Sequence, residues 1–175
     1  MITLDQLLSS RDARVAFQQQ LLKENPGACV VCLTVQLPGP VKRNATSLLI
    51  GKAGADALRA RFPGAPLTER DLPTGYEAYL PLQLSPAEAK RIACELEETH
   101  PLGRLMDIDV IGPDGPVSRA DIGLEPRRCL LCGNEVRYCM RAKSHSREEL
   151  LARIDEIVSK YIWNTENSHR KKSTS

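Results

Sequence analysis

The chain has 175 residues, 42% of them hydrophobic, and its 24 basic and 22 acidic residues leave a formal net charge of +2. This length and composition are typical of one globular domain, or of one domain with a small appendage, and exclude a disordered chain. The balanced charge gives no support by itself to nucleic-acid binding. No segment has the length of an apolar membrane span or the pattern of a secretory signal, so we expect a cytoplasmic protein whose six cysteines are free thiols or metal ligands rather than disulfides.

The start of the chain is predicted to form a helix followed by a strand. Thr3 and Gln6 make a capping box before a run of leucines at helical spacing, which predicts a helix from about residue 3 to 24. The β-branched stretch ACVVCLTVQL predicts a strand over 28–37. The sequence PGPVKRN then predicts a loop.

The middle of the chain is predicted to add a second strand and a second clear helix. Residues 45–62 are expected to contain a short strand and a helix. YEAYLPLQL predicts a strand over 76–84, in which Pro81 favours an edge position because proline has no N–H to donate. Ser85 is the predicted cap of a helix over 85–100.

The last third contains one strand, an irregular segment and one helix. A strand is predicted over 104–112, before a turn at GPDG. Residues 116–145 have no clear periodicity and are rich in arginine and cysteine. Ser146 is the predicted cap of a helix over 146–162.

The order of these elements predicts an α+β or α/β fold. A small mixed sheet would carry helices mainly on one face, which leaves the other face for a functional site. The fold would occupy a single domain over 1–163, followed by a polar and flexible tail over 164–175.

Two carboxylates interrupt the apolar run GRLMDIDV. Because side chains alternate between the two faces of a strand, Met106 and Ile108 would point to one face, and Asp107 and Asp109 to the other. The Cα atoms of the two aspartates would lie roughly 6–7 Å apart, and like charges at that separation repel unless a cation lies between them. The pattern therefore indicates a paired-carboxylate site on a strand.

Magnesium is the metal that such a pair favours. Mg²⁺ prefers oxygen ligands and commonly binds one or two carboxylates together with substrate phosphates. An Asp-x-Asp on a strand serves this purpose in phosphoryl and nucleotidyl transfer. We therefore predict Asp107 and Asp109 as catalytic residues and Mg²⁺ ligands. The alternative is that they are solvated residues on an open sheet face, or partners of nearby arginines.

Basic residues accompany this pair in the sequence. A polyphosphate site needs arginines and lysines because negative charge develops on the phosphoryl oxygens in the transition state. Each of these cations, taken alone, is also explained as a surface residue. The predicted phosphate-binding residues are Lys42, Arg104, Arg119, Arg127, Arg128, Arg141 and His145.

The segment CLLCGNEVRYCMRAKSH contains a second candidate site. Its spacing, C-x2-C-x6-C-x5-H, offers Cys129, Cys132, Cys139 and His145 as three thiolates and an imidazole for tetrahedral Zn²⁺. The alternative is that the thiols are reduced and pack behind an active site, while His145 donates to a phosphate.

Four stretches of the chain together resemble one known family. LPGPVK, HPLGRLMDIDV, SRADIGLEPRRCLLC and CMRAKSHSREEL occur in this order. They resemble the apo-citrate lyase phosphoribosyl-dephospho-CoA transferases, which are the holo-acyl-carrier-protein synthases of citrate lyase. The resemblance covers about residues 33–157, and the order of the motifs makes it specific.

The resemblance implies a nucleotidyltransferase that attaches a prosthetic group to a carrier protein. The family transfers the 5-phosphoribosyl-dephospho-CoA group from 2'-(5''-triphosphoribosyl)-3'-dephospho-CoA to a serine of the citrate lyase acyl carrier (gamma) subunit and releases diphosphate. Asp107 and Asp109 would hold Mg²⁺ on the phosphates, and one of them, or a hydroxide on the ion, would take the serine proton. Lys42, Arg104 and Arg119 would hold the triphosphate, while the other cations would contact phosphate, CoA or an acidic carrier protein.

Two other functions stay open from the residues alone. A related transferase that serves the carrier protein of malonate decarboxylase would use the same kind of precursor. A zinc-stabilised nucleic-acid-binding module would use the arginines and the basic HRKK segment, but the chain has few aromatic residues to stack on bases. We therefore expect neither a nucleic-acid nor a membrane partner.

Overall fold

The computed structural model describes residues 2–35 and 37–172, and the chain divides into two compact units, Met1–Pro126 (unit 1) and Arg127–Ser175 (unit 2). The helices and strands of unit 1 are α1 (Leu4–Glu24), β1 (Cys29–Val35), α2 (Ala45–Arg61), β2 (Thr68–Leu72), β3 (Gly75–Leu82), α3 (Pro86–Thr99), the 3-10 helix η1 (Gly103–Leu105), β4 (Asp107–Gly112), β5 (Gly115–Val117) and the 3-10 helix η2 (Ala120–Ile122). Those of unit 2 are α4 (Val136–Ala142) and α5 (Arg147–Lys172).

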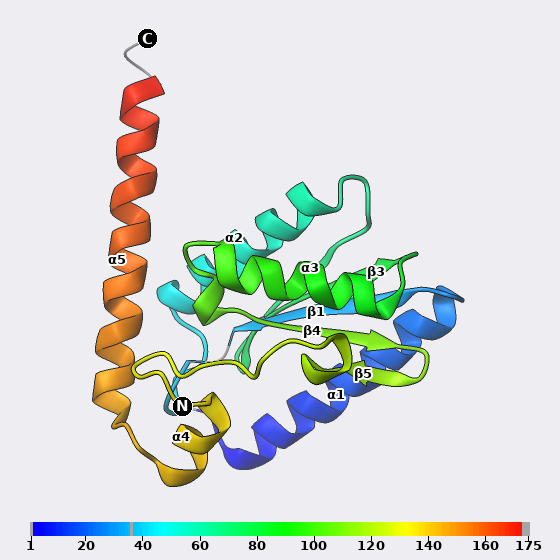
Figure 1. The fold of residues 1–175 in the computed structure, drawn as a ribbon, viewed down its shortest axis with the longest axis horizontal. Helices are drawn as coiled ribbons and strands as arrows, with labels where there is room; N and C mark the ends of the chain where they lie inside the picture. The colour runs from blue at the N-terminus through cyan, green and yellow to red at the C-terminus, as the bar shows by residue number, and fades with distance from the viewer. Residues whose placement is uncertain (1, 36, 173–175) are drawn as a thin grey trace. The chain divides into compact units, whose positions relative to one another are not determined.

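The strands of unit 1 form one sheet in the order β2-β3-β1-β4-β5 (Figure 1). The pairings between the described strands are all antiparallel. The predicted α+β class is confirmed, while the sheet is antiparallel rather than mixed, because each helical crossover skips one strand of opposite direction. The order β1-α2-β2-β3-α3-β4 is that of the ferredoxin-like motif.

Helices lie on both faces of this sheet. α2 and α3 lie above the strands in Figure 1 and α1 lies below them. Gly54 allows α2 to approach the sheet closely, because a Cβ at this position would lie only 2.7 Å from a methyl carbon of Leu33. On the other face, Phe17 of α1 packs edge-to-face on Tyr79, with ring centroids 4.8 Å apart. Two of the three described α-helices of unit 1 thus share one face, as predicted, and α1 covers part of the face that we expected to be open.

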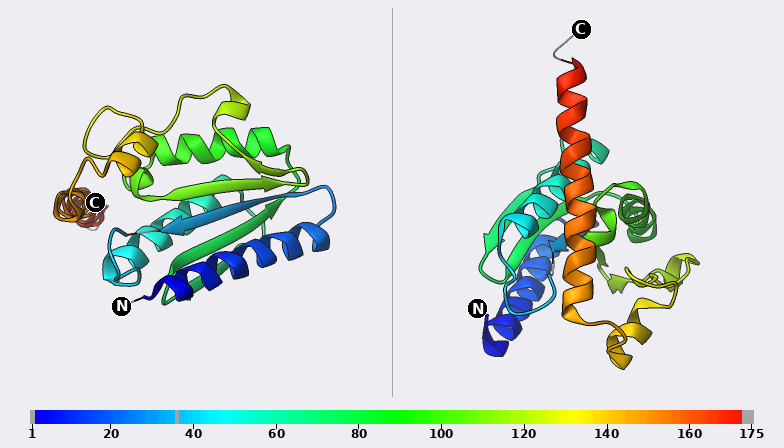
Figure 2. Two further views of the ribbon diagram at one scale, coloured as in Figure 1. Left: turned by 90° about the horizontal axis from the view of Figure 1, so that it is seen from below. Right: turned by 90° about the vertical axis from the view of Figure 1, so that its left-hand side faces the viewer.

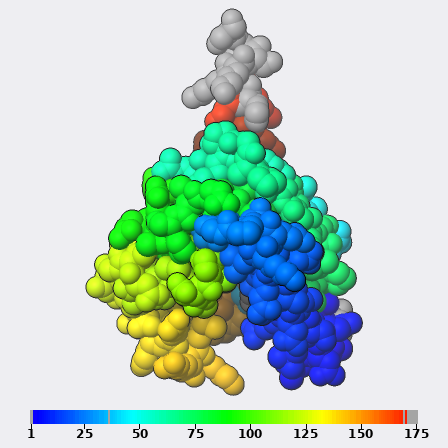
Figure 3. Space-filling view, turned by 90° about the vertical axis from the view of Figure 1, so that its right-hand side faces the viewer, coloured from blue at the N-terminus to red at the C-terminus, as the bar shows by residue number. Residues whose placement is uncertain are grey.

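Most of α1 lies at the surface of unit 1, where its blue atoms are visible in Figure 3. Only Gln18 and Leu21 of this helix are buried. Leu21 belongs to a core cluster with Val30, Cys32 and Tyr79. This cluster holds α1 against β1 and β3.

Local capping signals mark the starts of three helices as predicted. Thr3 and Gln6 form a reciprocal capping box at α1. The Oγ atom of Ser85 accepts a hydrogen bond from the N–H of Glu88 at α3. Ser146 forms a reciprocal box with a glutamate of the first turn of α5. These signals are local, so they do not depend on the rest of the fold.

Besides the two 3-10 helices, three elements of the described chain were not predicted: β2, β5 and α4. Each is short and has no apolar repeat, and β2, with the sequence TERDL, forms an edge of the sheet. Residues 45–62 were expected to contain a short strand as well as a helix, but residues 45–61 form the single helix α2. Apolar periodicity finds buried elements and misses edge elements that are largely solvated.

Pro81 does not mark an edge strand, so that prediction was wrong. β3 lies between β2 and β1. The pairing of β3 with β2 ends at Tyr79, whereas Pro81 pairs with Val30 of β1. The missing N–H therefore lies beyond the end of β2, where no strand requires it.

The end of the chain is helical over most of the predicted tail. α5 runs past the predicted end at residue 162 to Lys172, so residues 164–172 are part of the helix. Position 36, within the predicted strand 28–37, and positions 173–175 lie outside the described residues. One domain over 1–163 stays a prediction. No helix in the described part of the chain is long and apolar enough to cross a membrane.

Candidate functional site

The two aspartates lie on one face of β4, as the alternation predicted. Ile108 is buried, whereas Asp107 is partly exposed and Asp109 is exposed. Asp107 lies opposite Thr34 of β1, and Asp109 lies opposite Cys32. Since Cys32 packs in the core cluster beneath α1, both aspartates belong to the face of the sheet on which α1 lies.

Arg104 is not on this strand, which corrects the predicted start at residue 104. It lies in η1, and β4 begins at Asp107. The chain turns tightly here because Gly103 packs against the end of α3, where a Cβ would lie 2.4 Å from the carbonyl oxygen of Leu96 and 2.6 Å from that of Glu97. The alternating pattern alone did not reveal this close approach.

Two buried charged side chains of α3 hold the backbone of β4 between the aspartates. The Nζ atom of Lys90 donates to the carbonyl oxygen of Ile108 at 3.0 Å. The N–H of Ile108 donates to the Oε1 atom of Glu97 at 2.9 Å. The β4–β5 pairing stops at Val110, so these side chains replace a neighbouring strand at Ile108. Sequence reasoning missed both residues, although Lys90 and Glu97 are seven positions apart and share the buried face of the helix with Ala93.

Arg119 contacts α3 instead of the aspartates. It donates to Oε2 of Glu97 at 2.8 Å and to Oε1 of Glu98 at 2.7 Å. Burial would lower the pKa of Arg119, but the two carboxylates outweigh it and raise that pKa above its usual range. The guanidinium is thus held against the helix that covers the opposite face of the sheet from the aspartates (Figure 1).

Lys42 lies in the loop after β1, at the end of the sheet where β4 begins. Its Nζ atom donates to the carbonyl oxygen of Leu37 at 2.6 Å, and burial followed by the charge of Arg11 lowers the pKa of Lys42. In the same loop, Arg43 makes a two-bond ion pair with Asp71 at 2.8 Å. An open hollow of about 520 Å³ lies here, lined by Ile2, Pro40, Val41, Lys42, Arg43, Asp71 and Pro73.

The other predicted basic residues belong to unit 2. Arg127 is partly exposed, and Arg128 and Arg141 are exposed. The Nη1 atom of Arg128 donates to the carbonyl oxygen of Gly133 at 3.3 Å, across the loop that carries the first two cysteines. Arg127 and Arg128 therefore directly precede the cysteine segment, and Arg141 lies within it.

The structure brings all four residues of the predicted zinc set together. The ligand atoms of Cys129, Cys132, Cys139 and His145 lie within 4.8 Å of one another. The Sγ atoms of Cys132 and Cys139 are 3.5 Å apart. The Nε2 atom of His145 is buried without a hydrogen-bond partner, one of two such side-chain atoms in the described part of the chain. This Cys3His cluster could hold a metal ion.

Local backbone structure positions these four ligands. The N–H of Cys129 donates to the carbonyl oxygen of Asn134 at 2.7 Å and closes the loop that carries the first two cysteines. Cys139 lies on α4, and the chain then turns at Lys143, whose φ of 48° is in the left-handed region. This turn brings His145 back to the cysteines.

The cluster also favours ionisation of one thiol. Burial opposes the thiolate form of Cys129, but hydrogen bonds from the N–H groups of Leu131 and Cys132 and the neighbouring thiols outweigh it and lower the pKa of Cys129. Burial, followed by the neighbouring thiols, raises the pKa of Cys139. The six cysteines, which all belong to the described residues, form no disulfide.

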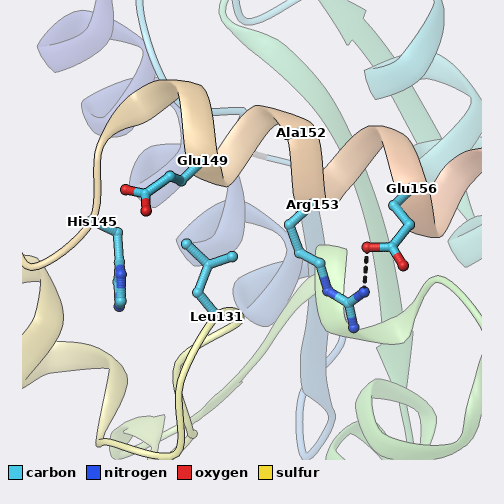
Figure 4. Close-up of a pocket in the computed structure, with 6 residues that line it drawn as sticks. All are labelled: Leu131, His145, Glu149, Ala152, Arg153 and Glu156. Atoms are coloured by element: carbon cyan, nitrogen blue, oxygen red, sulfur yellow. Dashed lines mark hydrogen bonds and ion pairs between the residues drawn. The ribbon is translucent and has the colours of Figure 1, made fainter.

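A second hollow, of about 540 Å³, lies beside His145 (Figure 4). Its lining residues are Leu131, His145, Glu149, Ala152, Arg153 and Glu156. Arg153 donates to Glu156 at 2.5 Å, and Glu149 accepts the N–H of Ser146 at 2.7 Å. Glu149 and Glu156 both accept hydrogen bonds, and Arg153 is paired with Glu156. The lining of this hollow is therefore not suited to bind phosphate.

Comparison with known proteins shows that the chain is similar in sequence to one family of enzymes. The profile of the apo-citrate lyase phosphoribosyl-dephospho-CoA transferase family matches residues 2–161. The chain is 38% identical over 164 residues to proteins of that description from Escherichia coli O1:K1 and Shigella boydii serotype 18. Each alignment covers 90% of this chain and 89% of the relative.

Proposed function

The chain belongs to the apo-citrate lyase phosphoribosyl-dephospho-CoA transferase family and is an enzyme that transfers a prosthetic group, and we propose that Asp107 and Asp109 are the carboxylates on which the transfer depends. The observation that carries this proposal is their position on one face of β4, on either side of the residue that α3 holds. The donor we propose is 2'-(5''-triphosphoribosyl)-3'-dephospho-CoA, and the acceptor is a serine of the citrate lyase acyl carrier subunit. The family assignment favours this carrier over that of malonate decarboxylase.

The two aspartates fit the ligand set of Mg²⁺. They are neighbouring carboxylates, one partly exposed and one exposed, on a strand whose backbone is fixed. When bound, Mg²⁺ supplies positive charge to the phosphate oxygens and to the departing diphosphate. One of the two carboxylates accepts the proton of the serine hydroxyl, whose oxygen attacks the phosphorus that carries the diphosphate. The new bond is the phosphodiester to serine, and the bond to diphosphate breaks.

Lys42 and Arg104 are the cations of unit 1 that we propose for the triphosphate. Both lie at the end of the sheet where β1 ends and β4 begins. The pairing of Arg119 with two carboxylates of α3 favours a role in holding α3 and β4. Phosphate binding by Arg119 stays a prediction, as do contacts of phosphate, CoA or the carrier with Arg127, Arg128 and Arg141.

We propose a structural Zn²⁺ ion in the Cys3His cluster. A tetrahedral zinc site with thiolate ligands places them roughly 3.8 Å apart, close to the observed 3.5 Å between Cys132 and Cys139. The buried Nε2 atom of His145 fits a fourth ligand, because a metal would supply the partner that this atom lacks. In this arrangement His145 binds metal and does not donate to phosphate.

Metal analysis tests the zinc proposal. We expect one zinc ion per chain, and a cobalt-substituted protein should show the absorption band of thiolate-to-cobalt charge transfer. Cys132→Ser should lose both signals, whereas Cys94→Ser, a buried cysteine of α3 outside the cluster, should keep them. Protein that takes up neither metal would rule out the site.

The partner that follows from this function is the carrier subunit of citrate lyase. A cytoplasmic location and the absence of a nucleic-acid partner stay predictions from the composition.

Transfer to the apo-carrier tests the proposed site directly. Purified enzyme, Mg²⁺, precursor and apo-carrier are mixed, and intact-protein mass spectrometry follows the mass gained by the carrier. Asp107→Asn and Asp109→Asn should each slow this gain by at least about 100-fold without changing the circular dichroism spectrum. Asp114→Asn, in the exposed turn after β4, is the matched control and should transfer normally. Near-normal transfer by either β4 variant would contradict the proposal.

A further inference from the structure

Thr34 of β1 is a buried residue whose hydroxyl has no hydrogen bond. The residue is 2% exposed, and its Oγ1 atom is the second of the two buried side-chain atoms without a partner in the described part of the chain. A buried hydroxyl without a partner destabilises the folded state relative to an apolar group of the same shape. Valine has that shape and already occupies three other positions of β1, whose sequence is CVVCLTV. The threonine at this position therefore indicates that the hydroxyl has a hydrogen-bond partner when ligands are bound to the protein.

Thr34 lies between two carboxylates in one row across the sheet. Its partner on β3 is Glu77, and its partner on β4 is Asp107. Glu77 is 3% exposed, and both of its oxygens already accept hydrogen bonds: Oε1 from Arg14 at 2.9 Å, and Oε2 from the hydroxyl of Tyr79. These bonds direct Glu77 toward Arg14 and Tyr79. Asp107 is the carboxylate of the row that belongs to the candidate site.

A hydrogen bond from Thr34 to Asp107 requires no movement of the backbone. Residues directly opposite each other on antiparallel strands have Cβ atoms roughly 4.5–5.5 Å apart, so side-chain rotation alone brings a hydroxyl within reach of a carboxylate. The β4 backbone beside Asp107 is held by Lys90 and Glu97 of α3. A carboxylate has about four acceptor positions, so this bond is compatible with other partners of Asp107.

We propose that Thr34 is a positioning residue for Asp107, and this inference rests on the function proposed above. When metal and phosphate are bound, the Thr34 hydroxyl donates to one oxygen of Asp107 and turns the other oxygen toward the ion. Hydrogen bonds that orient a metal ligand in this way typically change metal affinity or activity by about 10-fold to 100-fold.

The test compares Thr34→Val with Thr34→Ser. Valine keeps the shape and removes the hydroxyl, whereas serine keeps the hydroxyl. Binding of Mn²⁺ in the presence of inorganic triphosphate is measured from the electron paramagnetic resonance signal of the free ion, and thermal unfolding gives Tm. We expect Thr34→Val to weaken Mn²⁺ binding about 10-fold, with a Tm equal to or above that of the wild type.

Further readouts separate positioning from a structural effect. Thr34→Ser should bind Mn²⁺ as the wild type does, and the KM for the carrier should be the same in all three proteins. Thr99→Val is the control, because it removes an exposed hydroxyl that donates to the carbonyl oxygen of Glu95 within α3. This variant should match the wild type in Mn²⁺ binding. Wild-type Mn²⁺ binding by Thr34→Val would overturn the inference. A lower Tm for that variant, or its failure to fold, would also overturn it, because the hydroxyl would then have a partner in the unloaded protein.

Asp107→Asn distinguishes this inference from the function beneath it. If Asp107→Asn keeps Mn²⁺ binding, the proposed metal site is wrong. If Asp107→Asn loses Mn²⁺ binding while Thr34→Val keeps it, the role of Thr34 alone is wrong.

Discussion

Buried charged side chains in unit 1 have hydrogen-bonded partners. Glu77 pairs with Arg14 and Tyr79, and Glu97 pairs with Arg119 and the N–H of Ile108. Such partners are required because burial of an isolated charge is far more costly than burial of a paired one. The two buried side-chain atoms without partners in the described residues, on Thr34 and His145, each lie in a candidate site. At the scale of single residues, these two unpaired atoms therefore belong to residues that we propose for the two sites.

Glu69 on β2 contributes to stability in a way that depends on pH. A hydrogen bond from Tyr76, opposed by burial and reinforced by Arg59 and Lys52, lowers the pKa of Glu69 to about 2. Because the folded pKa is depressed, the contribution is fully present above the unfolded pKa of about 4.3 and is lost as the pH falls toward the folded value. We expect Glu69→Gln to reduce the free energy of unfolding by about 1–2 kcal/mol at neutral pH, after allowance for solvent screening.

Urea unfolding between about pH 7 and pH 3 measures this effect. The difference between Glu69→Gln and the wild type should shrink as the pH falls. Glu95→Gln is the control, because its ion pair with Arg61 is exposed and 3.7 Å long. A difference for Glu69→Gln that is the same at every pH would contradict the prediction.

At the scale of elements, α3 acts as a support for β4. Its small residues Ala89 and Ala93 are buried, and its buried Lys90 and Glu97 bond to the backbone of Ile108. A strand edge without a neighbour leaves backbone groups unpaired, and two side chains of one helix satisfy them here. A helix that precedes the two aspartates in the chain therefore helps to fix the backbone between them.

Glu97 and Glu98 provide a matched comparison of this support. Both accept a hydrogen bond from Arg119, but Glu97 also accepts the N–H of Ile108. We expect Glu97→Ala to lower the free energy of unfolding by about 3 kcal/mol, because it leaves the buried N–H of Ile108 without its acceptor and removes one of the two carboxylates that Arg119 contacts. Glu98→Ala removes an exposed ion pair and should cost less than about 1 kcal/mol. Denaturant unfolding of both variants gives the comparison, and equal losses would show that the bond to Ile108 does not contribute.

At the scale of the whole molecule, the two units differ in how many buried apolar residues they contain. Unit 1 has a five-stranded sheet with buried apolar side chains on both faces. Unit 2 is small, and its buried hydrophobic residues are Cys129, Cys139, Ile154 and Val158 among those described. A unit of this size commonly needs a disulfide or a metal to be stable. The Cys3His cluster supplies the ligands for a metal.

Removal of zinc should therefore loosen unit 2 selectively. With a strong zinc chelator, we expect trypsin to cleave within residues 127–147 much faster than without it, because metal binding and folding are coupled in such segments. Gel electrophoresis with mass spectrometry of the fragments locates the cleavage sites. Cys132→Ser should be cleaved at the faster rate with or without chelator. Unchanged cleavage of the wild type after zinc removal would contradict a structural role for the metal.

Features that depend on neighbours along the chain could be predicted from the order of the amino acids. Helix starts at Thr3, Ser85 and Ser146 follow from capping residues three positions from their partners. The common face of Asp107 and Asp109 follows from the alternation of side chains along a strand. The set of three cysteines and one histidine is likewise visible as a spacing over a short segment. The order of the four short motifs was also sufficient to indicate the family.

Contacts between residues far apart in the sequence depend on how the helices and strands pack together. Arg119 faces Glu97 and Glu98 on α3, and Thr34 lies opposite Asp107, through pairings between segments far apart in the sequence. The positions of the edge strand β2 and of α1, which lies on the face that carries the aspartates, were also not predictable. They depend on which surfaces pack together. Local sequence sets the direction of a side chain on its own element. The packing of elements decides which partner that side chain finds, and so whether a charge becomes part of the scaffold or part of the site.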